Sequence, residues 1–528
     1  MILTFCGHNY TMLQVTNATP EEMQAIKAAV TEKVNAFQAR KHDNWNGDVS
    51  MVWYVNNYFY IPAGCWQRIW NLRFPDPQRY RPAYNVEFRN QDKFFNKAIT
   101  IEEVADFVAT LNPAFDDVTD QVTVLHSILR HRLSSHNIAT GFGKTYLAYL
   151  LAQYTAQQMD GKTLLIAPRV LLVEQGMKDF AEYMQTIAEE SRLQCYGICG
   201  SYVNKCKFAD ADVYIGTYQS IVNMPADVFD AVKTVICDEG HTAKALSVKD
   251  SVSKCTNAEI ITAISGTLSY SSGADALTIE QFCGPQITNY SAHQQIEKGR
   301  LPKIAVQQII LQHTDGSELY QQLLQQERLP MPAKTSKGNA TYPAELASSY
   351  RRIEMQYLST NLHMLNCILQ LCKTITDKGK NVLVLFTNRR PAINLFEYAN
   401  QQGHKAHLIF GDTASDIRQG VKQQIENEGG WILSATTGTM SMGVSINNLQ
   451  GIVMCMTGHS PHVTLQAIGR MLRKHKDKFE VTVCYDIVND CSPIGTHFDR
   501  NNGANRMKYY QTEQHPIYPT VCRQAINY

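Results

Sequence analysis

The chain has 528 residues, a hydrophobic content of 44% and a formal net charge of +1 at pH 7. At about 150 residues per domain, this length is enough for three or four globular domains. The nearly neutral charge does not by itself indicate a nucleic-acid partner, so any basic surface must be local. No apolar run reaches the roughly 18 residues of a membrane-spanning helix, and the N-terminus lacks the basic and apolar regions of a signal peptide.

The 14 cysteines are scattered, and many lie within apolar runs. This usage is typical of reduced, buried thiols in a cytosolic protein. One local cluster, Cys195, Cys199 and Cys206, lacks the paired C-x2-C spacing of a structural zinc site. The pattern therefore favours a surface loop over a zinc site.

Residues 1–110 predict a small α+β accessory domain. A strand pattern is followed by Thr19-Pro20-Glu21-Glu22, a capping box with proline at the first helical position, and then by a predicted hairpin over 49–62. Between the helix and the hairpin, Arg40, Lys41 and Trp45 form a basic and aromatic cluster. Two interpretations are open, namely a nucleic-acid contact and a solvated turn with one core tryptophan.

From residue 115 onward, short apolar strands alternate with helices, and each strand ends in a polar or glycine-containing motif. This alternation predicts a parallel sheet with crossover helices, whose functional loops lie at the carboxyl ends of the strands. We expect one such lobe over 115–298 and a second over 381–490. Residues 299–380 predict a strand and helices that lead into the second lobe, and residues 491–528 predict a polar tail that packs only locally.

The loop Ala139-Thr140-Gly141-Phe142-Gly143-Lys144-Thr145 lies between a predicted strand and a predicted helix. Backbone N–H groups in such a loop, together with the helix dipole, form an anion site suited to phosphates. Lys144 would contact the β- and γ-phosphates of ATP, and the Thr145 hydroxyl would bind Mg²⁺. The full phosphate-loop pattern has glycine where this chain has Ile138.

A second motif, Asp238-Glu239-Gly240-His241, ends the apolar strand that begins near Val235. In a phosphate-loop ATPase, Asp238 would hold the metal and Glu239 would polarise the attacking water. The alternative is that the two carboxylates only cap the next helix.

A third motif, Gln466-Ala467-Ile468-Gly469-Arg470-Met471-Leu472-Arg473, belongs to the second lobe. Gln466, Arg470 and Arg473 recur at helical spacing and would share one face of a helix. Arginines presented to a nucleotide from a second domain neutralise charge in the transition state. The alternative is an ordinary exposed basic face.

Together these motifs resemble those of the DExH-type superfamily 2 helicases, with Ser265-Gly266-Thr267 as a further match. The resemblance implies two tandem RecA-like lobes with ATP bound between them, with catalytic roles for Lys144, Asp238, Glu239, Gln466, Arg470 and Arg473 and metal contacts from Thr145 and Asp238. It also implies a set of nucleotide-contacting residues: Gln121, Thr140, Gly141, Phe142, Gly143, Lys144, Thr145 and Gly443. Further stretches that resemble motifs of the family lie at 168–175, 216–220 and 384–388. They imply nucleic-acid contacts from Arg169, Thr217, Gln219, Thr387 and Asn388, to which the accessory cluster adds Arg40, Lys41 and Trp45.

Within that superfamily, the stretches 216–221, 465–475 and 44–47 are similar to those of the recombination helicases of tailed phages. This likeness implies an ATP-dependent DNA translocase that remodels branched DNA by fork regression, branch migration and dissociation of D-loops and R-loops. It would act in phage recombination, repair and replication, in the host cytoplasm and alongside other phage proteins. The chain departs from the pattern at Thr145, where serine is found, and at Gly240, where cysteine or alanine is usual.

Two other functions are compatible with the sequence. DExH motifs also occur in RNA helicases, so an RNA substrate remains open. A non-catalytic scaffold that binds or anneals nucleic acid is the second alternative, although the intact Lys144, Asp238, Glu239 and Arg470 argue against a decayed motor.

Overall fold

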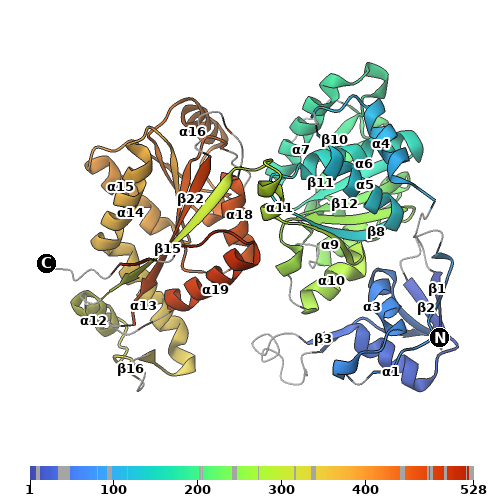
Figure 1. Ribbon diagram of the computed structural model, residues 1–528, viewed down its shortest axis with the longest axis horizontal. Helices are drawn as coiled ribbons and strands as arrows, with labels where there is room; N and C mark the ends of the chain where they lie inside the picture. The colour runs from blue at the N-terminus through green and yellow to red at the C-terminus, as the bar shows by residue number, and fades with distance from the viewer. Residues whose placement is uncertain are drawn as a thin grey trace. The chain divides into compact units, whose positions relative to one another are not determined.

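The structure is a computed structural model, and it divides the chain into two compact units, Met1–Tyr290 and Ser291–Tyr528 (Figure 1). The residues described are 1–6, 12–33, 48–56, 58–79, 81–91, 98–115, 117–200, 204, 206–240, 246–270, 273–313, 317–334, 340–440, 446–458, 460–472, 475, 480–492, 496, 498–518 and 520–522.

The first unit begins with a five-stranded sheet of order β5-β6-β2-β1-β7, in which only the β1–β7 pair is parallel. Its strands are β1 (Ile2–Cys6), β2 (Met12–Thr16), β5 (Trp53–Val55), β6 (Tyr58–Pro62) and β7 (Glu87–Arg89). Helix α1 (Pro20–Ala29) begins with the predicted capping box, because the Thr19 hydroxyl accepts from the Glu22 amide and the Glu22 carboxylate accepts from the Thr19 amide. The predicted α+β accessory region is therefore confirmed.

The first unit also holds a two-stranded antiparallel sheet, β3 (Thr31–Lys33) with β4 (Asp48–Ser50). Its lobe is built on a seven-stranded sheet of order β10-β11-β9-β12-β13-β8-β14, and every pair in that sheet is parallel. Its strands are β8 (Leu133–Ile138), β9 (Lys162–Ala167), β10 (Cys195–Ile198), β11 (Val213–Thr217), β12 (Val232–Asp238), β13 (Ile260–Ser265) and β14 (Gln286–Tyr290). One face packs against α4 (Ile101–Thr110), α5 (Thr119–His131), α6 (Lys144–Gln158) and α7 (Val170–Tyr183). This is the predicted parallel-sheet lobe.

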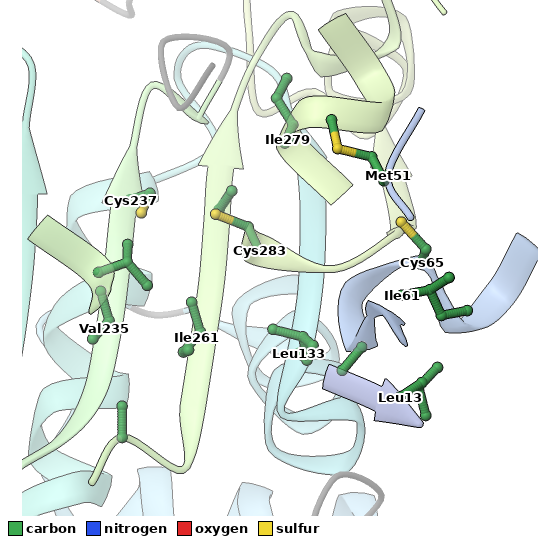
Figure 2. Close-up of a cluster of buried hydrophobic side chains, with 14 of the residues drawn as sticks. Leu13, Met51, Ile61, Cys65, Leu133, Val235, Cys237, Ile261, Ile279 and Cys283 are labelled. Atoms are coloured by element: carbon green, nitrogen blue, oxygen red, sulfur yellow. The ribbon is translucent and has the colours of Figure 1, made fainter. Parts of the chain in front are cut away.

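The opposite face of that sheet shares its hydrophobic core with the accessory region. Figure 2 shows side chains of the accessory region, such as Ile61 and Cys65, on one side and strand residues of the lobe, such as Leu133 and Ile261, on the other. The join is close, since a Cβ at Gly64 would lie 1.7 Å from the carbonyl oxygen of Glu280. The accessory region therefore packs firmly on the first lobe.

An ion pair reinforces this join. Arg68, on α3 (Trp66–Trp70), donates to Glu280 Oε2 at 2.5 Å, and Glu280 lies on α10 (Gly273–Cys283) of the lobe. The same guanidinium donates to Glu32 Oε1 at 2.8 Å.

The second unit is built on another all-parallel seven-stranded sheet, of order β19-β20-β18-β21-β22-β15-β23. Its strands are β15 (Lys303–Gln312), β18 (Val382–Phe386), β19 (Ala406–Ile409), β20 (Ile432–Thr436), β21 (Gly451–Cys455), β22 (Val481–Asp490) and β23 (Thr520–Cys522). One face is covered by α12 (Ser317–Gln326), α13 (Ala347–Thr360), α14 (Leu362–Thr376) and α15 (Arg389–Gln401). The other face packs against α16 (Ser415–Asn427) and α18 (Pro461–Met471). The two-lobe fold expected from the sequence is thus confirmed.

Two boundary expectations need correction. Residues 99–110, which we placed at the end of the accessory domain, pack in the core of the first lobe through Ile99, Val104 and Val108. The residues after 490 are not a locally packed tail, since α19 (Phe498–Thr512) lies along β22 and β23 pairs with β15. The polar composition of α19 was misleading because its buried face is itself polar.

Candidate nucleotide site and nucleic-acid surfaces

The phosphate loop connects β8 to α6 through two glycines with positive φ, 88° at Gly141 and 97° at Gly143. Residues with a Cβ rarely adopt this conformation, so both positions need glycine. Helix α6 has no side-chain cap on its first-turn N–H groups. The amino end of this 15-residue helix is therefore available to an anion, as a phosphate site requires.

Lys144 and the two carboxylates of the second motif meet at this loop. The Lys144 ammonium lies 3.5 Å from Glu239 Oε1, and both side chains are mostly buried. A small cavity of about 50 Å³ is lined by Lys144, Thr145 and Asp238, together with apolar side chains of β9 and α7. The hydroxyl and carboxylate oxygens of Thr145 and Asp238 are the hard ligands that Mg²⁺ prefers, so the residues present fit that ion.

Ser265, the last residue of β13 and the first of the Ser265-Gly266-Thr267 motif, contacts the acidic pair. Its hydroxyl donates to Glu239 Oε2 at 3.0 Å and accepts from the Thr267 amide at 3.3 Å. Glu239 has a φ of 50°, and its amide donates to Asp238 Oδ1 at 2.9 Å. Ser265 at Oε2 and Lys144 at Oε1 therefore hold the Glu239 carboxylate from both sides, which is the rigid placement that orienting a water molecule needs.

Gln121, on α5, lies directly against the phosphate loop. Its Nε2 donates to the Phe142 carbonyl oxygen at 2.6 Å, while its Oε1 is buried and accepts no hydrogen bond from any residue that the structure describes. A buried acceptor of this kind suits the exocyclic amino group of an adenine. The Phe142 side chain is itself in the core, with its ring centroid 5.1 Å from that of Tyr290.

The residues predicted to bind nucleic acid on the first lobe follow two neighbouring strands. Arg169 is exposed and follows β9 at the start of α7, and Gln219 is exposed on the helix that follows β11, α8 (Tyr218–Val222). The Thr217 side chain is buried, and it caps α8 by accepting from the Ser220 amide at 3.3 Å. Thr217 is therefore placed to shape this surface rather than to project from it.

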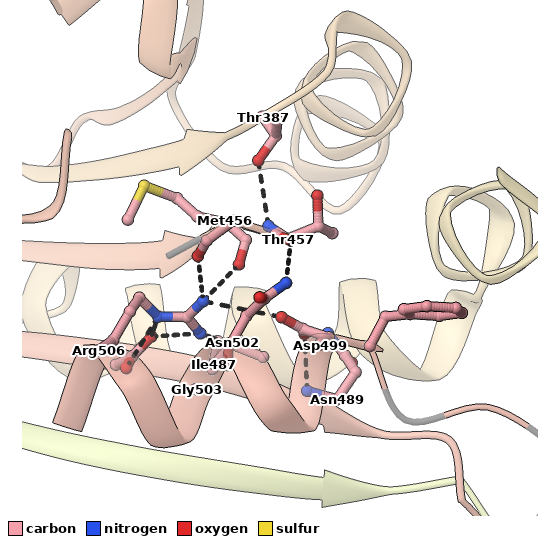
Figure 3. A network of polar contacts seen from close by, with 12 residues as sticks. Thr387, Met456, Thr457, Ile487, Asn489, Asp499, Asn502, Gly503 and Arg506 are labelled. Carbon is pink, nitrogen blue, oxygen red and sulfur yellow. Dashed lines mark hydrogen bonds and ion pairs between the residues drawn. The ribbon is translucent and has the colours of Figure 1, made fainter. Parts of the chain in front are cut away.

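On the second lobe, Thr387 and Asn388 are exposed and follow β18. The Thr387 hydroxyl accepts from the Thr457 amide at 3.1 Å, and the Thr457 carbonyl oxygen accepts from Asn502 Nδ2 at 2.5 Å (Figure 3). Asn502 belongs to α19, so the C-terminal helix supports this strand end.

Arg506, also on α19, is a residue that motif analysis missed. Its fully buried guanidinium pairs with Asp486 at 2.9 Å and donates to the carbonyl oxygens of Met456 and Gly458 (Figure 3). These carbonyls precede α18, which carries Gln466, half-buried, and Arg470. The only hint in the sequence was a basic residue within a polar stretch, which resembles an exposed face.

Several predicted residues lie outside the described part of the chain. They are Arg40, Lys41, Trp45, Gly443, Arg473 and the side chain of Arg470. Of the described helices, none combines the length and apolar character that crossing a bilayer demands.

Two family models match the chain, and together they span both lobes. The type III restriction enzyme res subunit matches residues 115–270, and the helicase conserved C-terminal domain matches residues 363–475. The chain is a superfamily 2 helicase. This helicase is 25% identical over 454 residues to the ATP-dependent DNA helicase uvsW of Enterobacteria phage T4, covering 85% of the chain and 82% of that relative.

A second relative of this helicase is the probable helicase D10 of Escherichia phage T5, with 22% identity over 345 residues, 65% of each chain. Among solved structures, a fragment of a putative HsdR subunit of a type I restriction enzyme from Vibrio vulnificus YJ016 aligns with a TM-score of 0.52 and 15% identity. That alignment covers 80% of this chain and 72% of the other, and at this identity it shows a common fold. The helicase domains and the relatives make the protein an ATP-dependent enzyme.

Proposed function

We propose that this helicase translocates on DNA and remodels branched DNA by fork regression, branch migration and dissociation of D-loops and R-loops. The observation that carries the proposal is the 25% identity to a phage DNA helicase, which extends over 82% of that relative rather than over the motor motifs alone. The accessory region, packed on the first lobe, provides surface for a second DNA arm. We place this activity in phage recombination, repair and replication within the host cytoplasm, alongside other phage proteins.

In the proposed mechanism, the amino end of α6 and the Lys144 ammonium bind the phosphates of ATP. Gln121 reads the adenine through its amide, and Glu239, held by Ser265, orients the attacking water. Mg²⁺ held by Thr145 and Asp238 would neutralise charge on the phosphates. Gln466, Arg470 and Arg473 would stabilise the charge that develops in the transition state.

On the DNA, Arg169 and Gln219 would contact the phosphates of one strand from the first lobe. Thr387 and Asn388 would do so from the second lobe. Alternation between lobe closure and opening during hydrolysis would then move the strand stepwise.

The deciding experiment measures ATP turnover without nucleic acid, with single-stranded DNA, with a synthetic four-way junction and with RNA of matched length. We expect the junction to stimulate turnover most and the same protein to migrate its branch point. Stimulation by RNA alone would reassign the enzyme to the RNA helicases. Turnover on DNA without any movement of a fork or junction would refute branched-DNA remodelling.

The Lys144→Ala variant distinguishes an ATP-driven motor from a non-catalytic scaffold that binds or anneals nucleic acid. A motor loses branch migration when Lys144 is removed, whereas an annealing scaffold keeps its activity. Lys178→Ala is the matched control, because Lys178 is an exposed lysine of α7 in the same lobe.

A further inference from the structure

A cavity of about 410 Å³ lies where the accessory region meets the first lobe. Its accessory wall comes from α3 and the turn after it, η3 (Asn71–Arg73), and from β7. Its lobe wall is the last turn of α5, with Arg130 and His131. None of the residues discussed for ATP or for the strand-end motifs lines this cavity.

The lining is unusually rich in aromatic rings. Trp70 and Phe88 stack with ring centroids 6.0 Å apart, and Trp66 stacks on His131 at 6.5 Å with an interplanar angle of 6°. The Arg73 guanidinium lies 3.8 Å from the centre of the Trp70 ring and holds that ring in place. At the rim, Phe74 remains 58% exposed and Trp70 36% exposed.

Aromatic side chains that line a cavity and remain partly exposed at its rim are typical of ligand sites. Aromatic rings stack on nucleobases, and base–aromatic stacking contributes about 1–3 kcal/mol per base. Phe74, the most exposed ring of the cavity, has surface available for such a contact. The geometry of the rim thus suits a planar heterocycle.

The polar groups of the cavity indicate what else the ligand carries. Arg130 is an exposed cation on the lobe wall, and the described lining contains no carboxylate. Gln67, Asn71 and Gln91 add amide groups that can donate to and accept from a base edge. Burial lowers the pKa of His131, so its ring lies against Trp66 in the neutral form. An anion is favoured here, and it would be held by Arg130.

We propose that this cavity binds an unpaired nucleobase of single-stranded DNA, with the base against Phe74 and Trp70 and its phosphate on Arg130. This inference rests on the proposed DNA substrate and adds a site that none of the helicase motifs supplies. An apolar protein segment is less suited to the cavity, because it would offer no partner to the Arg130 guanidinium or to the amide groups of Gln67 and Asn71, whereas Gln91 already donates to the Phe88 carbonyl oxygen at 3.1 Å.

The location gives the site a use at a branch point. A base must be unstacked to enter a cavity of this kind, and unpaired bases are available where strands separate. Helix α5 forms the lobe wall at its carboxyl end and carries Gln121 near its amino end. A base held here would therefore contact the same rigid helix that touches the phosphate loop.

The test measures binding of the full chain to two single strands of equal length, one with all bases and one with abasic sites at every position. Both strands carry the same phosphates, so their affinity ratio reports base contacts alone. We expect Phe74→Ala to reduce the preference for the base-bearing strand ~10-fold and to leave abasic binding unchanged. We expect Arg130→Ala to lower the affinity for both strands by the same factor. The number of counterions released on binding, read from the salt dependence of the affinity, should fall by about one.

The matched aromatic control is Tyr518→Ala, because Tyr518 is 59% exposed and lies in the other unit. A second readout is photocrosslinking of iodouracil-substituted DNA to the unmodified protein, which we expect to label the peptide that contains Trp70 and Phe74. An unchanged preference in Phe74→Ala, or crosslinks that map only elsewhere, would overturn the site.

Failure of this site is distinguishable from failure of the proposed function. Junction-stimulated ATP turnover by the unmodified protein tests the function without reference to the cavity. If turnover is stimulated and Phe74→Ala binds like the unmodified protein, only the base site is wrong. If no DNA stimulates turnover, the proposed function is wrong, and the strand-affinity ratio still decides whether the cavity binds a base.

Discussion

The buried guanidinium of Arg506 donates a hydrogen bond to the carbonyl oxygen of Gly458 at 2.7 Å. The same group pairs with Asp486 and lies 3.8 Å from Asp499, so one arginine of α19 joins two buried carboxylates to the loop before α18. Helix α18 carries Gln466 and Arg470, which we propose to sense the nucleotide. The C-terminal helix α19 therefore fixes the loop that leads into the amino end of this sensing helix.

We therefore expect Arg506→Met to destabilise the second unit by about 3–5 kcal/mol, since it leaves Asp486 and Asp499 buried without their cation. Urea unfolding followed by circular dichroism measures the loss. Arg500→Met is the control within the same helix, because Arg500 is 53% exposed and its pair with Asp490 should contribute less than about 1 kcal/mol. Equal stabilities of the two variants would show that the Arg506 network is not a stabilising element.

A second prediction concerns pH. Burial raises the pKa of Glu354 to about 7, against 4.5 for the ordinary carboxyl group, although the side chain accepts from the amides of Phe498 and Asp499. The folded state thus binds a proton that the unfolded chain has already released, so stability should fall as pH rises from 4.5 through about 7. Burial also raises the pKa of Asp499, and that shift acts with the same sign.

Thermal unfolding between pH 5 and 8 would measure this slope. Glu354→Gln should flatten it, whatever its effect on absolute stability, because glutamine does not titrate. Glu345→Gln is the control, since Glu345 is an exposed carboxylate in the turn before α13 and should leave the slope as it is. A slope that Glu354→Gln does not change would place its source at another group.

A third prediction concerns the phosphate loop. Lys144→Ala removes the ammonium that faces Glu239 at 3.5 Å, and we expect ATP turnover to fall at least ~100-fold, because this charge stabilises the phosphates most in the transition state. Steady-state turnover with saturating DNA measures the change, with Lys178→Ala as the surface control. Turnover within a few-fold of the unmodified protein would remove Lys144 from the catalytic set.

A fourth prediction concerns the base of the nucleotide. Gln121→Ala removes both the amide that donates to Phe142 and the buried Oε1 acceptor. If Gln121 reads adenine, KM for ATP should rise ~10-fold while the KM for GTP changes little, since GTP presents a different base edge. An equal rise in both values would indicate that Gln121 only supports the loop.

The nucleotide motifs could be predicted from the sequence because their requirements are local. The turn of the phosphate loop needs glycine at 141 and 143, where φ is positive, and Lys144 must follow at the first position of the helix. The two carboxylates at the end of β12, Asp238 within the strand and Glu239 directly after it, close an apolar run that is recognisable in isolation. Periodicity and these spacings were therefore sufficient to predict two parallel-sheet lobes and the position of the candidate ATP site.

The tertiary structure alone decided which polar residues are buried. In sequence, Arg506 looks like one more charge on a polar helix, and its burial depends on Asp486 of β22 and on carbonyls before α18. Likewise, β23 becomes a strand of the second sheet only through its pairing with β15, about 200 residues upstream in the chain. The aromatic cavity also required the fold, since its walls come from α3, β7 and α5, and no short stretch of sequence contains them together. Local patterns encode the backbone conformation of each element, whereas burial and pairing depend on groups that are distant in sequence and become neighbours only when the chain folds.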